Sequence, residues 1–268
     1  LIFDARFERK YSRRISRLSQ IKALMKMRFG NTDTESIRRI IVDIYDDKLR
    51  YIDQNLNELF YFLSSEGLIG DTLIVLTSDH GQELWDHGYF GHIARFYDEL
   101  LHIPLILFCP EIERGINEKL VSHLDLAPTI LGFIGIDPPK NYRGYNLLST
   151  THARPFVISE AAHNERGVYI QSFQLFPANF RTYAIRTKEW KYIRREKNRK
   201  LYNLKEDPME TENLIDQEER KAEEFEMIIK KHMLWEERIR KHRSIFSEKK
   251  RIRKKLKRLK SLSVRKFT

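Results

Sequence analysis

Residues 73–81 read Leu73-Ile74-Val75-Leu76-Thr77-Ser78-Asp79-His80-Gly81, an apolar run that ends in a carboxylate, an imidazole and a glycine. Uninterrupted aliphatic and β-branched residues are typical of a strand that is covered on both faces. In open α/β sheets, ligands bind beyond the carboxyl ends of the strands. The stretch therefore predicts a buried strand with a functional site at its end.

The candidate metal ligands are Asp79 and His80, because a carboxylate and a neutral imidazole together suit a divalent cation. The loop that follows adds further polar side chains and two glycines that let it bend: Glu83, Asp86, His87, His92 and Arg95, with Gly88 and Gly91. An isolated Asp-His-Gly is more often a polar loop that caps a strand, since short motifs match by accident. The apolar strand and the density of polar residues favour a site here.

Length and composition indicate a globular protein. The chain has 268 residues and is 41% hydrophobic, enough for one large domain or for one domain with appendages. The single cysteine, Cys109, excludes an internal disulfide, so a cytoplasmic location is slightly favoured, and we expect this side chain to pack as a small apolar group. No apolar run is long enough to span a membrane. The chain starts without methionine, so we expect it to be a piece of a longer product.

The positive charge is concentrated at the C-terminal end. Residues 230–268 hold 17 of the 49 Lys and Arg residues but three of the 38 acidic ones, so the rest of the chain is nearly neutral. We expect residues 217–260 to form a solvent-exposed helix that leaves the globular body. Its charge predicts at most weak contact with an anionic surface, and no specific nucleic acid is expected.

The remaining pattern predicts an α/β protein. Apolar residues recur at helical spacing over 35–66, from Ile37 and Ile41 through Leu49 and Ile52 to Leu63, which predicts a long helix with a buried stripe. The apolar runs 73–77, 105–108 and 156–159 are expected to form one mostly parallel sheet with flanking helices and an unpaired, apolar edge. Residues 183–204 alternate as in a separate antiparallel meander.

Three divisions of the chain follow. We expect the main α/β domain to cover 1–180, the small antiparallel subdomain 181–216 and the charged helical tail 217–268. Asp125 stands where a helix N-cap is expected, with Pro128 in the first turn, which favours a structural role.

Several of these stretches carry a resemblance to a known family, in consistent order over about residues 36–215. The resembling stretches are 45–68, 72–81, 88–92, 97–106, 123–129, 184–193 and 201–214. Together they resemble the C-terminal half of a sulfatase of the alkaline phosphatase superfamily, including the small C-terminal sheet of that fold.

The resemblance implies a hydrolase of sulfate esters that uses one divalent cation, usually Ca²⁺. It implies that Asp79 and His80 bind the metal. A basic residue of the following loop commonly contacts the sulfate or the leaving oxygen, which here points to His92 and Arg95 as catalytic residues, although lysine is usual at that position. A dication and basic side chains neutralise the charge that builds on the sulfuryl oxygens.

One part of the family pattern is missing. Sulfatases carry Cys or Ser followed by x-Pro-x-Arg, and two metal-binding aspartates, in their N-terminal half. The segment Cys109-Pro110-Glu111 does not fit, and no other cysteine exists. A formylglycine nucleophile is therefore expected only in a missing N-terminal part, and we expect this chain alone to be inactive.

Two other functions stay open. A phosphoester or phosphonate hydrolase of the same superfamily would reuse the Asp79 and His80 site, because sulfate and phosphate esters need similar charge stabilisation. A non-catalytic, basic-tailed binding protein derived from a sulfatase half is the third hypothesis. Substrate identity is not specified by these motifs, although residues 161–180 are expected to contribute to it.

Overall fold

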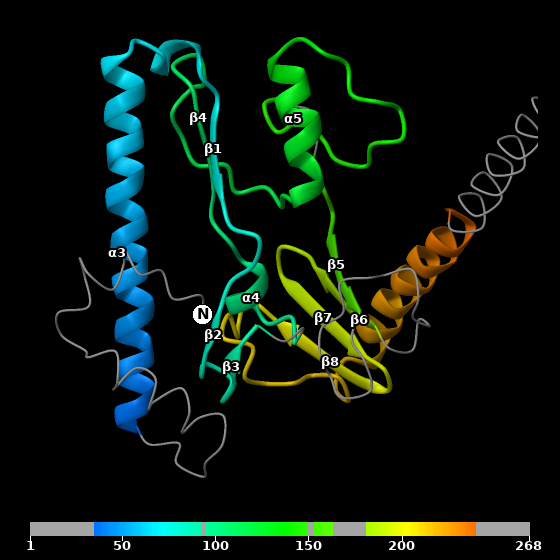
Figure 1. Ribbon diagram of the computed structural model, residues 1–268. Coiled ribbons are helices and arrows are strands. Elements are labelled where there is room, and N and C mark those ends of the chain that lie inside the picture. The colour runs from blue at the N-terminus through cyan, green and yellow to red at the C-terminus, as the bar shows by residue number, and fades with distance from the viewer. Residues whose placement is uncertain (1–34, 93–94, 150–152, 163–180, 240–268) are drawn as a thin grey trace, which may run out of the picture. The chain divides into compact units, whose positions relative to one another are not determined.

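The computed structural model describes residues 35–92, 95–149, 153–162 and 181–239 (Figure 1). The chain forms two compact units. Residues 1–34, most of the stretch expected to set specificity and the end of the basic tail lie outside the described residues. Within the described part of the chain, no helix is both long and apolar enough to cross a membrane.

The first unit comprises described residues 35–92 and 99–118. Its elements are α3 (Glu35–Ser65), η2 (Ile69–Asp71), β1 (Ile74–Thr77), β2 (Glu83–Leu84), β3 (Phe90–Gly91), most of α4 (Asp98–Leu101) and β4 (Leu105–Phe108). In this unit α3 runs beside the β1 and β4 pair (Figure 1). The predicted long helix is confirmed to within one residue at its C-terminal end.

The buried stripe of α3 is shorter than predicted. Ile41 is buried in a cluster with side chains of the β2–β3 hairpin, and Phe60 meets Phe108 of β4 edge to face. Leu49 and Ile52 nevertheless remain 48% and 51% exposed. A helix of 31 residues is about 46 Å long, whereas four-residue strands reach about 13 Å. The two strands are therefore too short to cover the helix.

The expected parallel sheet is wrong for the described residues, because every strand pair there is antiparallel. Ile74 pairs with Phe108 and Thr77 with Leu105. Parallel neighbours need a crossover of a dozen or more residues, usually a helix. The described connection between β1 and β4 contains only a two-residue hairpin pair and the four-residue α4. It therefore turns the chain back instead of carrying it over the sheet.

The second unit comprises described residues 95–98, 119–149, 153–162 and 181–239. Its elements are η3 (His123–Asp125), α5 (Leu126–Phe133), β5 (Val157–Ala162), β6 (Arg181–Arg186), β7 (Trp190–Arg195), β8 (Asn198–Asn203) and a final helix over 219–239. The four strands form one sheet in the order β5-β6-β7-β8. The predicted meander is thus present in a sheet separate from the β1 and β4 pair, but β5 joins it as a fourth strand.

The run 156–159, which we expected in the main sheet, contains the start of strand β5 of the four-stranded sheet. Strand β5 pairs along its whole length with β6, from Val157 opposite Arg186 to Ala162 opposite Arg181. Phe156 and Ile158 pack against the apolar core of this second unit. The pairing covers an edge of β6 that a three-stranded meander would leave open.

The helix over 219–239 is coloured orange in Figure 1. Contrary to the prediction, it packs against the globular body. Ala222, Phe225 and Ile229 are buried against the sheet, where they meet Tyr192 and Leu201. Their spacing of three and four residues places them on one helical face. The expected boundaries at 180 and 216 stay predictions, but this part of the predicted tail belongs to the core.

Candidate functional site

The end of β1 presents the two predicted metal ligands side by side. The Asp79 side chain is 87% exposed, and its Oδ2 lies 3.7 Å from Nε2 of His80. Its Oδ1 accepts the backbone N–H of His80 at 3.0 Å. Nδ1 of His80 is hydrogen-bonded to the carbonyl oxygen of Gly81 at 2.7 Å. That carbonyl requires a proton on Nδ1, which leaves Nε2 as the imidazole lone pair facing the carboxylate.

His92 joins this group. Its ring stacks on the ring of His80, with centroids 4.6 Å apart and planes 23° apart. Burial and the neighbouring His80 lower the pKa of His92, against a smaller opposing effect of Asp79. His92 is therefore neutral near pH 7. The structure thus brings together three of the four predicted site residues.

Gly81 holds the strand end against a second segment of the first unit. A Cβ atom at this position would lie 1.9 Å from the carbonyl oxygen of Glu99. The close approach lets the backbone N–H groups of Gly81 and Gln82 donate to Leu100 and Glu99, each at 2.9 Å. Glycine is required here for space rather than for a left-handed turn. Its absence of a side chain fixes the course of the loop that starts at His80.

The loop between β1 and β4 is braced by polar contacts. Nδ1 of His87 lies 2.7 Å from Oε1 of Glu99, and both side chains are largely buried. Gln82 donates to the carbonyl oxygen of Gly91 at 2.8 Å. Gly88 and Gly91 have φ angles of +77° and +110°, where glycine is favoured. The predicted role of these glycines in bending the loop is confirmed.

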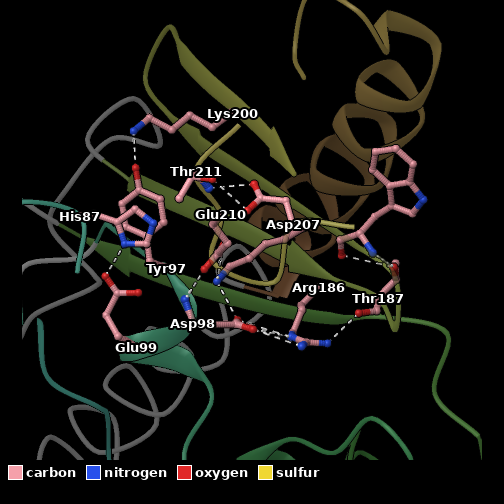
Figure 2. A network of polar contacts seen from close by, with 12 residues as sticks. His87, Tyr97, Asp98, Glu99, Arg186, Thr187, Lys200, Asp207, Glu210 and Thr211 are labelled. Carbon is pink, nitrogen blue, oxygen red and sulfur yellow. Dashed lines mark hydrogen bonds and ion pairs between the residues drawn. The ribbon is translucent and has the colours of Figure 1, made fainter. Parts of the chain in front are cut away.

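Arg95, the fourth predicted site residue, belongs to the second unit and is partly buried. Its catalytic role stays a prediction. Phe96 and Tyr97, which follow it, are buried. The hydroxyl of Tyr97 accepts a short hydrogen bond from Nζ of Lys200, so this segment is fixed to the four-stranded sheet (Figure 2).

A buried ionic network in the second unit was not predicted. Figure 2 shows Asp98 facing Arg186 and Glu210. Nζ of Lys191, which is fully buried, lies 2.8 Å from Oδ1 of Asp98 and 2.9 Å from Oε1 of Glu210. Nη2 of Arg186 lies 3.1 Å from Oδ2 of Asp98. Two cations of the sheet thus meet Asp98 at the start of α4 and Glu210 in the turn that follows the sheet.

The two carboxylates of this network respond differently to burial. Burial alone would raise the pKa of Asp98, but attraction by Lys191 and Arg186 outweighs it, so the pKa lies below its ordinary value. Burial raises the pKa of Glu210, and Lys191 offsets only part of that rise. Lys191 is thus the cation that counteracts the effect of burial on the Glu210 carboxyl.

The family motif at 207–214 explains how Glu210 reaches this position. Asp207 accepts the backbone N–H groups of Thr211 and Glu212 at 2.7 and 2.8 Å. Glu210 takes a left-handed conformation with φ of +55° and accepts the N–H of Asp98 at 2.5 Å. The sequence held one sign of this network. Lys191 lies between two aromatic residues, Trp190 and Tyr192, in a strand that is followed by this acidic motif.

Asp125 has the structural role that the sequence predicted. Its carboxylate is buried and accepts the backbone N–H groups of Ser122 and Tyr145, each at 2.8 Å. It also accepts a short hydrogen bond from Arg154. Asp125 is the N-cap residue of α5, but its side chain makes no capping bond there and instead completes the capping box that Ser122 starts. Cys109 is buried, as expected of a packed thiol.

Two known protein families match parts of this chain. Residues 5–136 match the family described as Sulfatase. Residues 85–241, more than half of the chain, match the family described as N-sulphoglucosamine sulphohydrolase, C-terminal. The chain belongs to the sulfatase family. The predicted resemblance is confirmed, and the Asp79, His80 and His92 group lies in the matched Sulfatase region of this sulfatase-family chain.

The similar proteins are longer than this sulfatase-family chain. Arylsulfatase K of Bos taurus is 32% identical over 168 residues, which cover 60% of this chain and 31% of that protein. N-acetylglucosamine-6-O-sulfatase of Bacteroides thetaiotaomicron is 31% identical over 189 residues, covering 66% and 32%. The chain therefore spans about a third of the length of these relatives.

A solved structure confirms the fold type. The phosphonate monoester hydrolase of Agrobacterium radiobacter superposes with a TM-score of 0.64 and is 25% identical. The superposition covers 76% of this chain and 43% of that chain. The fold of this sulfatase-family chain is thus of the sulfatase and alkaline phosphatase type, as expected, with antiparallel strand pairs in the described part.

Proposed function

We propose that this chain carries the C-terminal part of the active site of a sulfuric ester hydrolase. The observation that supports the proposal most directly is the convergence of Asp79, His80 and His92 at the end of β1. The exposed carboxylate and the paired imidazoles lie where an α/β fold binds its ligand. Membership of the sulfatase family supplies the reaction class.

The donor set fits a divalent cation. Asp79 offers an exposed carboxylate oxygen, and His80 offers the Nε2 lone pair that faces it. In the proposed enzyme these two residues hold Ca²⁺, which takes six to eight ligands and draws the others from elsewhere. When bound, the cation supplies positive charge that stabilises the sulfuryl oxygens.

His92 and Arg95 contact the sulfate ester in this proposal. A neutral His92 can donate one N–H to the leaving oxygen, and its stacking on His80 fixes the ring plane. Arg95 carries a permanent charge that suits a sulfuryl oxygen. These roles rest on the family resemblance and on the position of each residue in the loop.

The nucleophile and the remaining metal ligands belong, in this proposal, to a further N-terminal segment that contributes the formylglycine or serine. The apolar side chains that remain about half exposed in the first unit support a covering segment of this kind. They are Leu49 at 48%, Ile52 at 51%, Leu59 at 47% and Ile106 at 53%. Such side chains destabilise an uncovered surface and mark an interface.

The test compares an aryl sulfate and N-acetylglucosamine-6-sulfate as substrates of the 268-residue chain and of the longer gene product. We expect turnover only from the longer product, in the presence of Ca²⁺, and we expect Asp79→Asn to remove it. Turnover by the short chain that Asp79→Asn abolishes would reveal a nucleophile within these residues. Turnover by the longer product that survives Asp79→Asn would rule out the metal assignment.

A second candidate function is hydrolysis of phosphonate or phosphate monoesters. The solved phosphonate monoester hydrolase with a TM-score of 0.64 is the observation that favours it. The same longer product should then cleave an aryl phosphonate ester at a higher kcat/KM than the aryl sulfate. The opposite ratio assigns the enzyme to sulfate esters.

The basic tail gives a third hypothesis, weak contact with an anionic surface. A chain that ends at residue 239 should lose binding to phosphatidylserine vesicles at low salt while keeping its circular dichroism. Binding that survives this truncation would exclude the tail as its cause.

A further inference from the structure

A second cluster of possible metal ligands lies in the second unit, between β5 and the helix over 219–239. Glu160, His232 and Glu236 each offer one possible ligand atom, and these three atoms lie within 4.8 Å of one another. Nε2 of His232 lies 3.4 Å from Oε2 of Glu160. The cluster is separate from Asp79 and His80, which belong to the first unit.

The backbone prepares this arrangement. His232 and Glu236 stand four residues apart on the helix, so both side chains leave from one face. Glu160 lies opposite Tyr183 in the β5–β6 register, and the side chains of such a pair lie on the same side of a sheet. The helix therefore supplies two ligands and the strand supplies the third.

The imidazole of His232 is held between two aromatic side chains. The ring of Trp235 stacks on it with centroids 6.1 Å apart, and the edge of Tyr183 meets it at 6.3 Å. Its side chain is 12% exposed, and its Nδ1 is buried without a hydrogen-bond partner among the described residues. The ring orientation is thus fixed before any ligand binds.

A guanidinium lies beside the two carboxylates of the cluster. The buried Arg181 donates to Oε2 of Glu236 at 2.7 Å and lies 3.9 Å from Oε2 of Glu160. One guanidinium therefore faces two carboxylates. Each carboxylate has two oxygens, so Glu236 can bond Arg181 with one and another cation with the other.

Tyr183 provides an independent sign of a missing ligand. Its side chain is fully buried beside the cluster. The Arg181 guanidinium lies near enough to interact with the hydroxyl, which has no hydrogen bond of good geometry in the part of the chain that the structure describes. A buried hydroxyl without a partner is costly, so such groups are normally satisfied by protein, water or an ion.

We propose that Glu160, His232 and Glu236 form a binding site for Zn²⁺ that is distinct from the catalytic metal site. One nitrogen and two carboxylate oxygens suit a borderline divalent cation, and three protein ligands leave a fourth position for water. In the proposed site the Tyr183 hydroxyl hydrogen-bonds that water or a ligand oxygen. The site joins the final helix to β5 and stabilises the second unit.

Binding of Zn²⁺ requires the three ligand atoms to move slightly closer together. Zn²⁺ takes nitrogen and oxygen ligands at about 2.0–2.2 Å, which sets neighbouring ligand atoms of a tetrahedron about 3.3–3.6 Å apart. The His232 and Glu160 atoms already stand 3.4 Å apart. The remaining separations, up to 4.8 Å, close by rotation of the Glu236 side chain at the helix surface.

The test uses the full 268-residue chain, Zn²⁺ in competition with a chromophoric chelator, and Co²⁺ as a spectroscopic probe. We expect a His232-dependent site that binds one Zn²⁺ and gives visible Co²⁺ bands of a four-coordinate complex. His232→Ala and Glu236→Gln should each weaken Zn²⁺ binding by at least about tenfold. Circular dichroism establishes that each variant is folded, and Glu160→Gln replaces any variant that is not.

Two controls separate this site from other binding. Asp79→Asn alters the proposed catalytic metal site and should leave the Zn²⁺ affinity of the cluster unchanged. His123→Ala removes an exposed histidine of the same unit and should also have no effect. Failure to bind Zn²⁺ at millimolar concentration, or binding that ignores His232→Ala and Glu236→Gln, would overturn the proposal. Neither result bears on the sulfatase assignment.

Discussion

Replacing Lys191 by methionine is the sharpest test of the buried network in the second unit. The substitution keeps an unbranched apolar chain of similar length but removes the charge. Nζ of Lys191 lies 2.8 Å from Asp98 and 2.9 Å from Glu210, and the Lys191 side chain is fully buried. Asp98 keeps Arg186 at 3.1 Å. Glu210 keeps the backbone N–H of Asp98, which donates to its Oε2 at 2.5 Å, but loses the charge of Lys191.

The expected loss of stability follows from the unpaired carboxylate. Removing one partner of a buried ion pair typically costs about 3–5 kcal/mol, because the other charge stays buried without compensation. Burial already raises the pKa of Glu210, so without Lys191 this carboxyl should take up a proton at a higher pH. The double variant Lys191→Met with Glu210→Gln should therefore be more stable than Lys191→Met alone.

The assay is urea unfolding followed by circular dichroism, together with hydrogen exchange of peptides from β6 to β8. Lys205→Met is the matched control, because Lys205 is exposed in the turn after the sheet. We expect faster exchange over β6 to β8 in Lys191→Met and no change in the control. A Lys191→Met variant within about 1 kcal/mol of Lys205→Met, or additive effects in the double variant, would refute the reasoning.

Three other perturbations have definite expected outcomes. Gly81→Ala should lower the thermal stability by about 1–3 kcal/mol, because its Cβ meets a backbone carbonyl at 1.9 Å, whereas Gly70→Ala, with open space around it, should be near neutral in the same melt. Asp125→Asn should cost about 3–5 kcal/mol in urea unfolding, because a buried carboxylate loses its charge beside a guanidinium. Burial raises the pKa of Tyr192 and of Tyr202. Their contribution to the free energy of unfolding is therefore full below the pKa of tyrosine in the unfolded chain, about 10, and is lost as pH rises above it. Tyrosinate absorbance should appear together with alkaline unfolding, and Tyr192→Phe should reduce the slope of stability against pH.

The sequence predicted the elements whose conformation depends mainly on neighbouring residues. The helix expected over 35–66 spans Glu35–Ser65, because apolar residues at a period of 3.6 favour one backbone conformation regardless of distant partners. The strand Ile74–Thr77, which leads to Asp79, and the bending role of Gly88 and Gly91 follow from neighbouring residues in the same way. The chemistry of Asp79 and His80 marked them as candidate metal ligands, and the family resemblance added His92 and Arg95 as candidate catalytic residues.

Strand partners could not be predicted with the same certainty. An apolar run indicates that a segment is buried, but it does not indicate which neighbouring strand the segment pairs with or whether the pairing is parallel. The run at 105–108 therefore looked like a parallel neighbour of β1 and proved antiparallel. The run at 156–159 looked like part of the main sheet and proved to pair with β6.

The sequence by itself determined the family, the long helix, the meander and the Asp79, His80 and His92 group. Only the tertiary structure decided that Lys191, which is charged and adjacent to a turn, is buried, because its partner Asp98 lies 93 residues away. The same holds for Glu160 and His232, which are 72 residues apart. A charged side chain is placed by the partner that compensates it, and such a partner becomes visible only when the chain has folded.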